Sequence, residues 1–370
     1  MKIALISDGS SIHTIRWANG LSGEGHEVHV VTQHLVVDPL DPAVAVHQFP
    51  YRGVLGYFTM VPKIRRLFRA INPDVVNAHY ASGYGTTARI VNFHPWLLSV
   101  WGSDVYDFPN QSPLHRWLVG KNLRAADKVA STSYCMADET RTLAPELMDI
   151  AITPFGVDAA QFAIDDPRGD VAYSDIVIGT VKTMAPNYGI STLICAFAIL
   201  RRNLLSSNPS IAEKLQLRLV GDGSQTHELR HLAHELGIAH VTEFVGRVPH
   251  SEVPLELSKL DIYVSLSERE SFGVAIIEAG AAGRPVVVSD VGGLPEVTLD
   301  GVTGFVVPRN NPEAAADAIH RLVLDEGLRK QMGEAGRDHV VTNYAWSACV
   351  DQMVSVYKSV IAEKIKPASR

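Results

Sequence analysis

The sequence alternates, almost from end to end, between short apolar or β-branched runs and longer segments with a helical spacing of apolar residues. Such alternation implies parallel sheets that are covered by helices on both faces. The first run ends at Ser7-Asp8-Gly9 and has too short an apolar core for a signal peptide, so it predicts a buried strand. The predicted strands are 2–7, 27–32, 44–49, 74–79, 97–101, 128–132, 149–153, 175–181, 215–220, 241–245, 261–265, 285–289 and 304–307, and the helices include 14–22, 61–71, 112–124 and 136–143.

A length of 370 residues suits two domains rather than one. The polar, turn-rich stretch Asp165–Asp170 marks the break between them. The sequence therefore predicts an α/β protein of two Rossmann-like, doubly wound domains, residues 1–168 and 169–345, that face a cleft. We expect the final helix, within residues 346–370, to pack back on the first domain. Ligands of such folds bind beyond the carboxyl ends of the strands, so the loops that follow strands are the places to search.

Composition excludes several classes of protein. A formal net charge of −7 disfavours a general nucleic-acid binder, which needs a basic surface. The three cysteines, Cys135, Cys195 and Cys349, have no C-x-x-C spacing, which fits a reducing compartment and gives no sign of a zinc site. No apolar stretch reaches the roughly 20 residues that span a bilayer. These features predict a cytoplasmic protein that is at most peripheral at a membrane.

The strongest motif is Glu270-Ser271-Phe272-Gly273-Val274, followed by Glu278. A strand, a small-residue loop and a helix start present free backbone amides, so Gly273 and Val274 are predicted to meet a phosphate. Glu270 lies just outside the helix, and Glu278 lies more than one turn inside it, where a carboxylate suits the paired hydroxyls of a ribose. Alternatively, Glu270 caps the helix and Glu278 is solvated. The apolar, tightly packed sequence of residues 279–288 favours the binding role.

These residues resemble the retaining glycosyltransferases of group 1 (family four), which have the GT-B fold. The resemblance rests on Glu270 and Glu278 in an E-x7-E arrangement that encloses Phe272-Gly273. It spans nearly the whole chain in the expected order. The other matching segments are Pro154–Asp158, Leu219–Gly223, Phe244–Arg247, Gly292–Glu296 and Gly301–Phe305.

The resemblance implies a role for each matching position. Glu278 would bind the donor ribose, Glu270 would face the donor sugar, and the residues around Arg247 would border the base through backbone atoms. Members of this family usually need no divalent metal, and no D-x-D stands at a strand end, since Asp165-Asp166 falls in the predicted linker. The predicted donor-binding residues are Glu278, Ser271, Phe272, Gly273, Val274, Gly221, Gly223, Arg247, Val248 and Tyr188.

The chain departs from the family beside the diphosphate. Related enzymes place an Arg there and a Lys six positions later, whereas this chain has Lys182 and Tyr188. One cation should stabilise a leaving diphosphate less well than two. Either helix-start and loop amides supply the rest, or another cation reaches in. Lys182 could also be a plain surface lysine, but its place at a strand end favours the site.

A second departure lies in the first domain, where related enzymes often have His-Gly-x-Asp. Here Trp101 stands at the histidine position and Asp104 remains. Asp104 either orients the acceptor and accepts a proton from it, or caps a helix or turn. Some related enzymes also carry Trp here, so inactivity does not follow.

Two histidines of this domain follow predicted strands at the inferred cleft. Lone histidines are more often structural, but His13 and His79 lie where strands end, so both are predicted to touch substrate. The glycine pattern is not G-x-G-x-x-G, which argues against hydride transfer. The predicted catalytic residues are Glu270, Lys182, Asp104 and His13, and the acceptor side comprises Gly9, Ser10, Ser11, His79, Tyr80 and Trp101.

The resemblance implies a nucleotide-sugar donor, UDP-linked by preference and GDP-linked as the alternative, with a saccharide or lipid-linked acceptor and no cofactor. The helix of residues 61–71 carries Lys63, Arg65, Arg66 and Arg69 beside apolar residues. Such a helix can rest on anionic lipid, or it can be a surface helix with an ordinary buried face.

Two other classes of function stay open. A nucleotide-sugar epimerase on the same fold would isomerise or release its donor without an acceptor, and a phosphorylase would be much longer. A non-catalytic nucleotide-sugar-binding protein, which Trp101 and Tyr188 motivate, would bind a donor without turnover.

Overall fold

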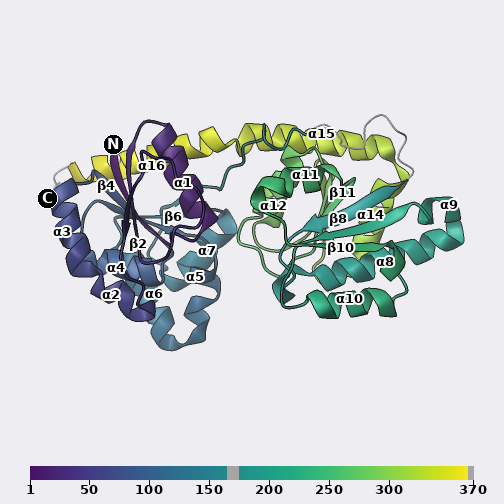
Figure 1. The fold of residues 1–370 in the computed structure, drawn as a ribbon, viewed down its shortest axis with the longest axis horizontal. Coiled ribbons are helices and arrows are strands. Elements are labelled where there is room, and N and C mark those ends of the chain that lie inside the picture. Colours follow the sequence, from purple (N-terminus) through teal and green to yellow (C-terminus); the bar gives the residue numbers. More distant parts are fainter. Residues whose placement is uncertain (165–174, 366–370) are drawn as a thin grey trace. The chain divides into compact units, whose positions relative to one another are not determined.

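The structure is a computed structural model that describes residues 1–164 and 175–365 (Figure 1). The chain divides into two compact units: unit 1 is Met1–Pro154 with Ser347–Arg370, and unit 2 is Phe155–Trp346. The boundary after Pro154 thus comes earlier than the predicted boundary at residue 168, because Val157 is hydrogen-bonded to residues at the end of unit 2. Its amide donates to the Tyr344 carbonyl at 2.8 Å, and its carbonyl accepts from the Trp346 amide at 3.0 Å. The predicted turn Asp165–Asp170 lies outside the described residues.

Unit 1 contains a seven-stranded parallel sheet in the order β3-β2-β1-β4-β5-β6-β7. Each strand lies within one residue of its predicted bounds, because apolar runs such as Val75–Val76 are buried on both faces of the sheet. The strands are β1 (Lys2–Ile6), β2 (Glu27–Thr32), β3 (Ala45–Gln48), β4 (Val75–His79), β5 (Trp96–Val100), β6 (Lys128–Ser131) and β7 (Ile150–Ile152).

The helices of unit 1 begin and end where local chemistry allows. In α6, the Ser112 hydroxyl accepts a hydrogen bond from the His115 amide, and Pro113 occupies the first turn. The last helix packs on this unit: Asn77 donates to the Tyr357 hydroxyl at 2.8 Å. The helices are α1 (Ile12–Gly23), α2 (Gly56–Thr59), α3 (Val61–Ile71), α4 (Gly83–Val91), α5 (Ser103–Tyr106), α6 (Pro113–Ala125), α7 (Tyr134–Leu143) and α16 (Trp346–Ile365).

Unit 2 contains a six-stranded parallel sheet in the order β10-β9-β8-β11-β12-β13, again within one residue of the predicted strands. The strands are β8 (Ile176–Val181), β9 (Leu215–Val220), β10 (Thr242–Gly246), β11 (Ile262–Ser265), β12 (Val286–Ser289) and β13 (Gly304–Val307). The helices are α8 (Ile190–Ser207), α9 (Pro209–Ala212), α10 (Thr226–Glu235), α11 (Val253–Ser258), α12 (Val274–Ala281), α13 (Leu294–Val297), α14 (Pro312–Leu324) and α15 (Glu326–Asn343). The two sheets confirm the predicted fold class.

Helix α8 is apolar for a structural reason. Within the described residues it is the one helix long and apolar enough to cross a membrane by length and composition. However, Leu193, Ile194 and Phe197 are fully buried in the core of unit 2, and α8 packs against α14. The apolar composition therefore serves packing within the unit.

Each sheet reverses its strand order at one place, between β1 and β4 in unit 1 and between β8 and β11 in unit 2. Open parallel sheets bind ligands beyond the carboxyl ends of the strands at such a reversal. In unit 2, Lys182 follows β8 and Glu270 lies in the loop after β11. In unit 1, Gly9 to Ser11 follow β1 and Tyr80 follows β4. The predicted site residues therefore cluster at the expected edge of each sheet.

Candidate functional site

Unit 2 has a cavity of about 470 Å³ beyond the carboxyl ends of β8 and β9. Several backbone segments meet there, and the lining carries cationic, anionic and apolar side chains. Five lining residues were predicted from the sequence to bind the donor or its diphosphate: Lys182, Gly221, Gly223, Arg247 and Val248. The others are Val181, Thr183, Val220, Asp222 and Val253.

Lys182 forms an ion pair at the edge of this cavity. Its Nζ donates to Glu270 Oε2 at 2.5 Å, and both side chains are about one-seventh exposed, at 13% and 14%. Burial by itself would lower the pKa of Lys182, but the Glu270 carboxylate opposes that effect and raises this pKa above its ordinary value. Lys182 is therefore a permanently charged, positioned cation and not a plain surface lysine.

The ring of Tyr188 lies against the same ammonium group. Lys182 Nζ is 4.6 Å from the centroid of the Tyr188 ring, which is within the range of a cation–π contact. Tyr188 ends a short 3-10 helix (Pro186–Tyr188) after β8 and is half-buried. Tyr188, which stands where related enzymes have a second cation, thus contacts Lys182, the first cation.

Two glycines bring the loops of this site together. Gly221 has a φ of +135°, and a side-chain carbon there would collide with the carbonyl oxygen of Lys182. Gly292 has a φ of +52°, and a side-chain carbon there would collide with the carbonyl of Glu270. The glycine-containing motifs after β9 and β12 therefore allow the Lys182 and Glu270 loops to pack closely.

The start of α12 borders the Glu270 loop. Gly273, with a φ of +109°, precedes the first helical residue, Val274, so the first amides of the helix have no partner within it. Phe272 differs from the prediction. Its side chain is 3% exposed and packs on Phe155 and Tyr344, with ring centroids 6.0 and 5.8 Å away. Phe272 can reach a donor through its backbone alone.

Glu278 is buried on α12 and has a partner that the sequence analysis did not single out. Its Oε1 atom lies 3.2 Å from Nε2 of His250. Glu278 is 7% exposed, whereas half of the His250 side chain is exposed. The sequence contained one sign that His250 could belong to the site, because it follows Arg247 by three positions and Val248 by two.

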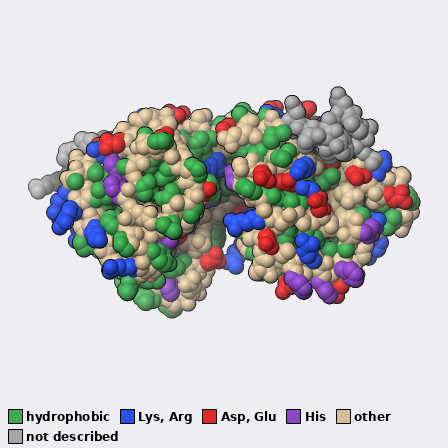
Figure 2. Space-filling view, viewed as in Figure 1, with side chains coloured by type: hydrophobic (Ala, Val, Ile, Leu, Met, Phe, Trp, Pro, Cys, Tyr) green, Lys and Arg blue, Asp and Glu red, His purple; other side chains and the backbone are tan. Residues whose placement is uncertain are grey.

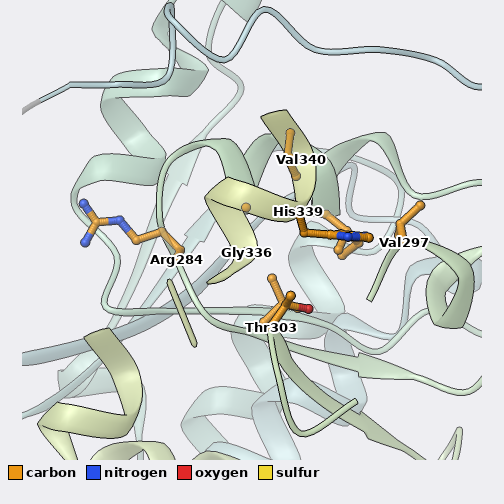
Figure 3. Close-up of a pocket in the computed structure, with 9 residues that line it drawn as sticks. Arg284, Val297, Thr303, Gly336, His339 and Val340 are labelled. Carbon is orange, nitrogen blue, oxygen red and sulfur yellow. The ribbon is translucent and has the colours of Figure 1, made fainter. Parts of the chain in front are cut away.

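A second cavity, of about 10 Å³, lies where α12 and α15 meet the strands β12 and β13 (Figure 3). Its lining includes Arg284, Thr303 and His339. This volume is close to the minimum that holds one water molecule. A side-chain carbon at Gly280 would come within 3.2 Å of the Gly336 carbonyl oxygen, so the small residues of α12 allow close contact with α15. This space is a packing feature and not a nucleotide site.

In unit 1, Asp104 has a structural role. Its Oδ2 atom accepts from the Ala81 amide at 2.6 Å, and its Oδ1 atom accepts from the amides of Trp101 at 3.1 Å and Gly102 at 2.9 Å. The side chain is 1% exposed, and burial raises its pKa even though these amides oppose the shift. Asp104 therefore caps the turn, as the alternative interpretation of the sequence expects, and its catalytic role stays a prediction.

A cluster of rings surrounds Trp101. The His79 ring lies 4.0 Å from the Trp101 ring, centroid to centroid, and His13 and Tyr80 contact other edges at 5.9 and 5.1 Å. His79 is fully buried. Its Nδ1 lies 2.8 Å from Ser7 Oγ, and burial, with a smaller contribution from His13, lowers its pKa to about 3. His79 is thus neutral near pH 7 and supports Trp101 from inside the unit, and its predicted contact with substrate stays a prediction.

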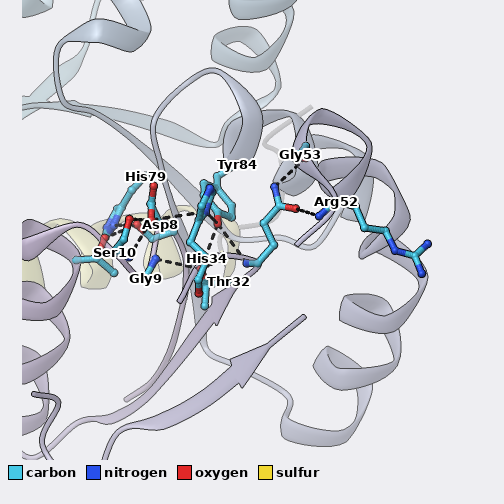
Figure 4. Close-up of polar contacts among 12 residues, drawn as sticks. Asp8, Gly9, Ser10, Thr32, His34, Arg52, Gly53, His79 and Tyr84 are labelled. Atoms are coloured by element: carbon cyan, nitrogen blue, oxygen red, sulfur yellow. Dashed lines mark hydrogen bonds and ion pairs between the residues drawn. The ribbon is translucent and has the colours of Figure 1, made fainter. Parts of the chain in front are cut away.

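The loop after β1 is fixed by hydrogen bonds within the loop and to Thr32 of β2 (Figure 4). The amide of Gly9 donates to Thr32 Oγ1 at 3.0 Å, that of Ser10 to Asp8 Oδ1 at 2.8 Å, and that of Ser11 to the Asp8 carbonyl at 3.2 Å. The amides of Gly9, Ser10 and Ser11, which are predicted acceptor-side residues, are thus already used within unit 1. Sequence reasoning also missed Tyr84, whose hydroxyl lies 2.6 Å from His34 Nδ1 and 3.1 Å from Thr32 Oγ1.

Two family models match the chain over these features. The model described as glycosyl transferases group 1 matches residues 165–339, and the model described as glycosyl transferase 4-like matches residues 2–133. Together with the two parallel sheets, these matches decide the family. The chain belongs to the group 1 glycosyltransferases of the GT-B fold.

Curated relatives of this glycosyltransferase span almost its full length. It is 24% identical to the N-acetyl-alpha-D-glucosaminyl L-malate synthase of Bacillus anthracis, over 96% of this chain and 95% of the relative. It is 25% identical to the glycogen synthase of Mycobacterium tuberculosis, over 99% and 94%. It also matches the D-inositol 3-phosphate glycosyltransferase of Corynebacterium diphtheriae over a shorter stretch. The identity there is 40%, over 34% of this chain and 29% of the relative.

Solved structures share the fold of this glycosyltransferase. Sucrose-phosphate synthase from Thermosynechococcus elongatus has a TM-score of 0.81 at 23% identity, over 98% of this chain and 99% of that one. Anabaena Alr3699/HepE in complex with UDP has a TM-score of 0.80 at 18% identity, over 97% and 100%. At these identities the likeness establishes the fold.

In residues 1–164 and 175–365, no group of three or more His, Cys, Asp or Glu side chains is placed to hold a metal ion. Asp165 and Asp166, which the sequence analysis set aside as linker residues, lie outside the described part of the chain.

Proposed function

We propose that this glycosyltransferase moves a hexose from a UDP-sugar to a saccharide or lipid-linked acceptor in glycan or polysaccharide synthesis, with retention of configuration and without a metal. The observation that carries the proposal is the cavity of unit 2, which is lined by five residues expected at a donor, among them Lys182 in its ion pair with Glu270. Anabaena Alr3699/HepE was solved with UDP and with UDP-glucose. That similarity supports UDP over GDP as the nucleotide.

In this proposal, Glu278 binds the ribose. Its carboxylate is buried and paired with a half-exposed His250, which a ribose hydroxyl can displace at little cost because the histidine already reaches solvent. Arg247 and Val248 line the same cavity and border the base. The nucleoside is then held by groups of unit 2.

Lys182 neutralises the diphosphate as it departs. An oriented cation at the position where charge develops stabilises the transition state without reorganisation. Glu270 and the Tyr188 ring fix the ammonium group from two sides. The α12 amides from Gly273 onward add partial positive charge to the same region.

The pairing of Glu270 limits the routes by which the configuration can be retained. A carboxylate paired with a lysine at 2.5 Å is a weak nucleophile, so a covalent glycosyl-enzyme through Glu270 is disfavoured. We propose that the bond from the anomeric carbon to the diphosphate oxygen breaks to give an oxocarbenium-like pair. The acceptor hydroxyl then bonds to that carbon from the face that the diphosphate leaves, and its proton passes to the departing diphosphate oxygen. The acceptor is assigned to unit 1, where Tyr80 and Trp101 offer rings at the ends of β4 and β5.

The test is a thermal-shift and calorimetric screen of the purified protein against a panel of nucleoside diphosphate sugars, with and without EDTA. We expect one UDP-sugar to bind, EDTA to leave the affinity unchanged, and Glu278→Ala to abolish binding. The matched control is Glu334→Ala, which removes an exposed carboxylate from α15 of the same unit. Failure of every donor to bind would reject the nucleotide-sugar function.

Turnover separates the remaining alternatives. With the identified donor and a panel of acceptors, the anomeric configuration of the product should equal that of the donor by NMR. Isomerised donor sugar without an acceptor would indicate an epimerase. Tight donor binding with no turnover for any acceptor would indicate a binding protein.

A further inference from the structure

Four neighbouring helices on one face of the unit 1 sheet have only basic residues among their charged side chains. The α2, α3, α4 and α6 helices contain no Asp or Glu, and Asp74 is the one acidic residue between positions 42 and 103. The whole chain has more acidic than basic residues, 40 against 33, so this distribution is not a consequence of composition. The Lys and Arg residues of these helices are Lys63, Arg65, Arg66, Arg69, Arg89, Arg116, Lys121 and Arg124.

These helices form one continuous surface. The α3, α4 and α6 helices pack side by side, since α4 contacts both of the others, and α2 contacts α4. Their buried residues share a single core with the sheet. Figure 1 shows α2, α4 and α6 grouped at one edge of unit 1 with α3 beside them, and Figure 2 shows basic side chains gathered over the position of α3. We call this surface the basic face.

The structure agrees with the second sequence-based alternative for α3, a surface helix with a buried face. Val61, Ile64 and Phe68 form its apolar side and are buried in the core, so α3 cannot insert that side into lipid. Its outer side is left with Lys63, Arg66 and Arg69, all exposed and without an ion pair to a described carboxylate. The fourth α3 cation, Arg65, donates to backbone carbonyls of α4.

Exposed apolar side chains lie on the same group of helices and just before α2. Val54 and Leu55, in a 3-10 turn (Gly53–Leu55) just before α2, are 74% and 69% exposed, and Phe58 on α2 is 47% exposed. On α6, Leu114 and Trp117 are 68% and 55% exposed. Large apolar side chains with this much exposure cost solvation free energy unless another phase receives them.

We propose that the basic face binds the surface of an anionic lipid bilayer, with Val54, Leu55 and Phe58 entering the interface and Lys63, Arg66 and Arg69 meeting lipid phosphates. Protruding apolar groups beside cations match a surface with negative headgroups over an apolar interior. These four helices have no carboxylates that anionic headgroups would repel. This inference does not rest on the proposed sugar transfer.

The experiment is flotation of the full-length protein with vesicles. One set is phosphatidylcholine alone, and the other contains about one-quarter phosphatidylglycerol. We expect binding to the anionic vesicles only, and release when NaCl rises from about 0.05 M to about 0.5 M, because surface charges are screened. Absence of binding, or equal binding to both vesicle types, would overturn the proposal.

Variants locate the surface. K63E/R66E/R69E should lower partition into anionic vesicles by about a hundredfold, given the usual contribution of each cation, and V54S/L55S should lower it by about tenfold. The matched control is R202E/K214E/R337E, which changes net charge equally at exposed positions of unit 2. An equal loss in the control would overturn the proposal, as would binding to an anionic polysaccharide but not to vesicles. If the triple variant fails to fold, Arg66→Glu alone should still weaken binding by about fivefold.

Discussion

The two units reverse their strand order in the same way, yet they fill the region beyond the reversal differently. In unit 2, that region holds a cavity of about 470 Å³ with a charged Lys182–Glu270 pair at its edge. In unit 1, the corresponding region holds the neutral ring of His79, the Trp101 ring and a fully capped Asp104. The same topology therefore supports a site for a charged ligand in one unit and a packed aromatic cluster in the other.

This difference has a physical basis in what each region has to stabilise. A diphosphate needs cations and free amides in place before it arrives. Unit 2 provides a paired lysine and a helix start at Gly273. Unit 1 uses the amides of Gly9 to Ser11 for its own loop, so it presents shape and apolar surface. We expect substitutions in unit 1 to change stability most and substitutions in unit 2 to change donor binding most.

The largest expected effect is on the stability of unit 1. Trp101→Ala removes a 7% exposed ring that contacts three others, and should destabilise the unit by about 3–5 kcal/mol. Urea unfolding followed by tryptophan fluorescence is the measurement, since four of the five tryptophans belong to unit 1. The exposed Trp117→Ala is the control and should change stability by less than about 1 kcal/mol. A loss equal to that control would show that the aromatic cluster contributes little.

The next effect is on sugar transfer. Lys182→Ala removes the cation at the diphosphate and leaves Glu270 without this partner, so kcat should fall by roughly 10²–10³-fold. Steady-state kinetics with the identified donor and acceptor check this, with Lys214→Ala as a control at an exposed position of unit 2. A kcat within about twofold of the wild type would remove Lys182 from the mechanism.

A smaller effect concerns pH and unit 1. The pKa of buried His79 is lowered to about 3 in the folded state, whereas the unfolded chain binds a proton below about 6.5. Stability is therefore fully present above about pH 6.5 and is lost as the pH falls, by about 1.4 kcal/mol per unit.

The measurement is the free energy of unfolding between about pH 6.5 and about pH 4.5, compared with His79→Gln. The wild type should lose about 2–3 kcal/mol more than the variant over this range. Parallel curves would mean that the pKa of His79 is not lowered in the folded protein.

The smallest effect tests the contact between Tyr188 and Lys182. Tyr188→Phe keeps the ring over the ammonium group and should leave UDP affinity within about twofold, while Tyr188→Leu removes the ring and should weaken it by about two- to fivefold. Calorimetric titration measures both. Equal affinity of the two variants would show that the ring does not position Lys182.

The strands and five of the residues that line the cavity could be predicted from the sequence. Apolar periodicity and the carboxyl ends of parallel strands are local features of the chain, so they can be recognised without the structure. Lys182, Gly221 and Arg247 lie far apart in sequence, and they line one cavity because each follows, or lies beside, a neighbouring strand. The pairing of His250 with Glu278 depends on side-chain directions that periodicity does not contain.

The contacts of the candidate residues in unit 1 could not be predicted from the sequence for a similar reason. Whether Asp104 meets a substrate or three amides depends on the turn at Gly102, whose φ is +139°. Its position two residues after a glycine at a strand end was the signal for a cap. Likewise, the burial of His79 depends on Trp101, which comes from a different strand end.

The central claim is that the donor site belongs to unit 2. Calorimetric titration of UDP into the wild type, Glu278→Ala and Trp101→Phe tests it most directly. We predict that the wild type and Trp101→Phe bind UDP with the same Kd, and that Glu278→Ala binds at least tenfold more weakly, since a lost charged hydrogen bond costs about 1.5–3 kcal/mol. Unchanged affinity in Glu278→Ala, together with a loss in Trp101→Phe, would contradict the account.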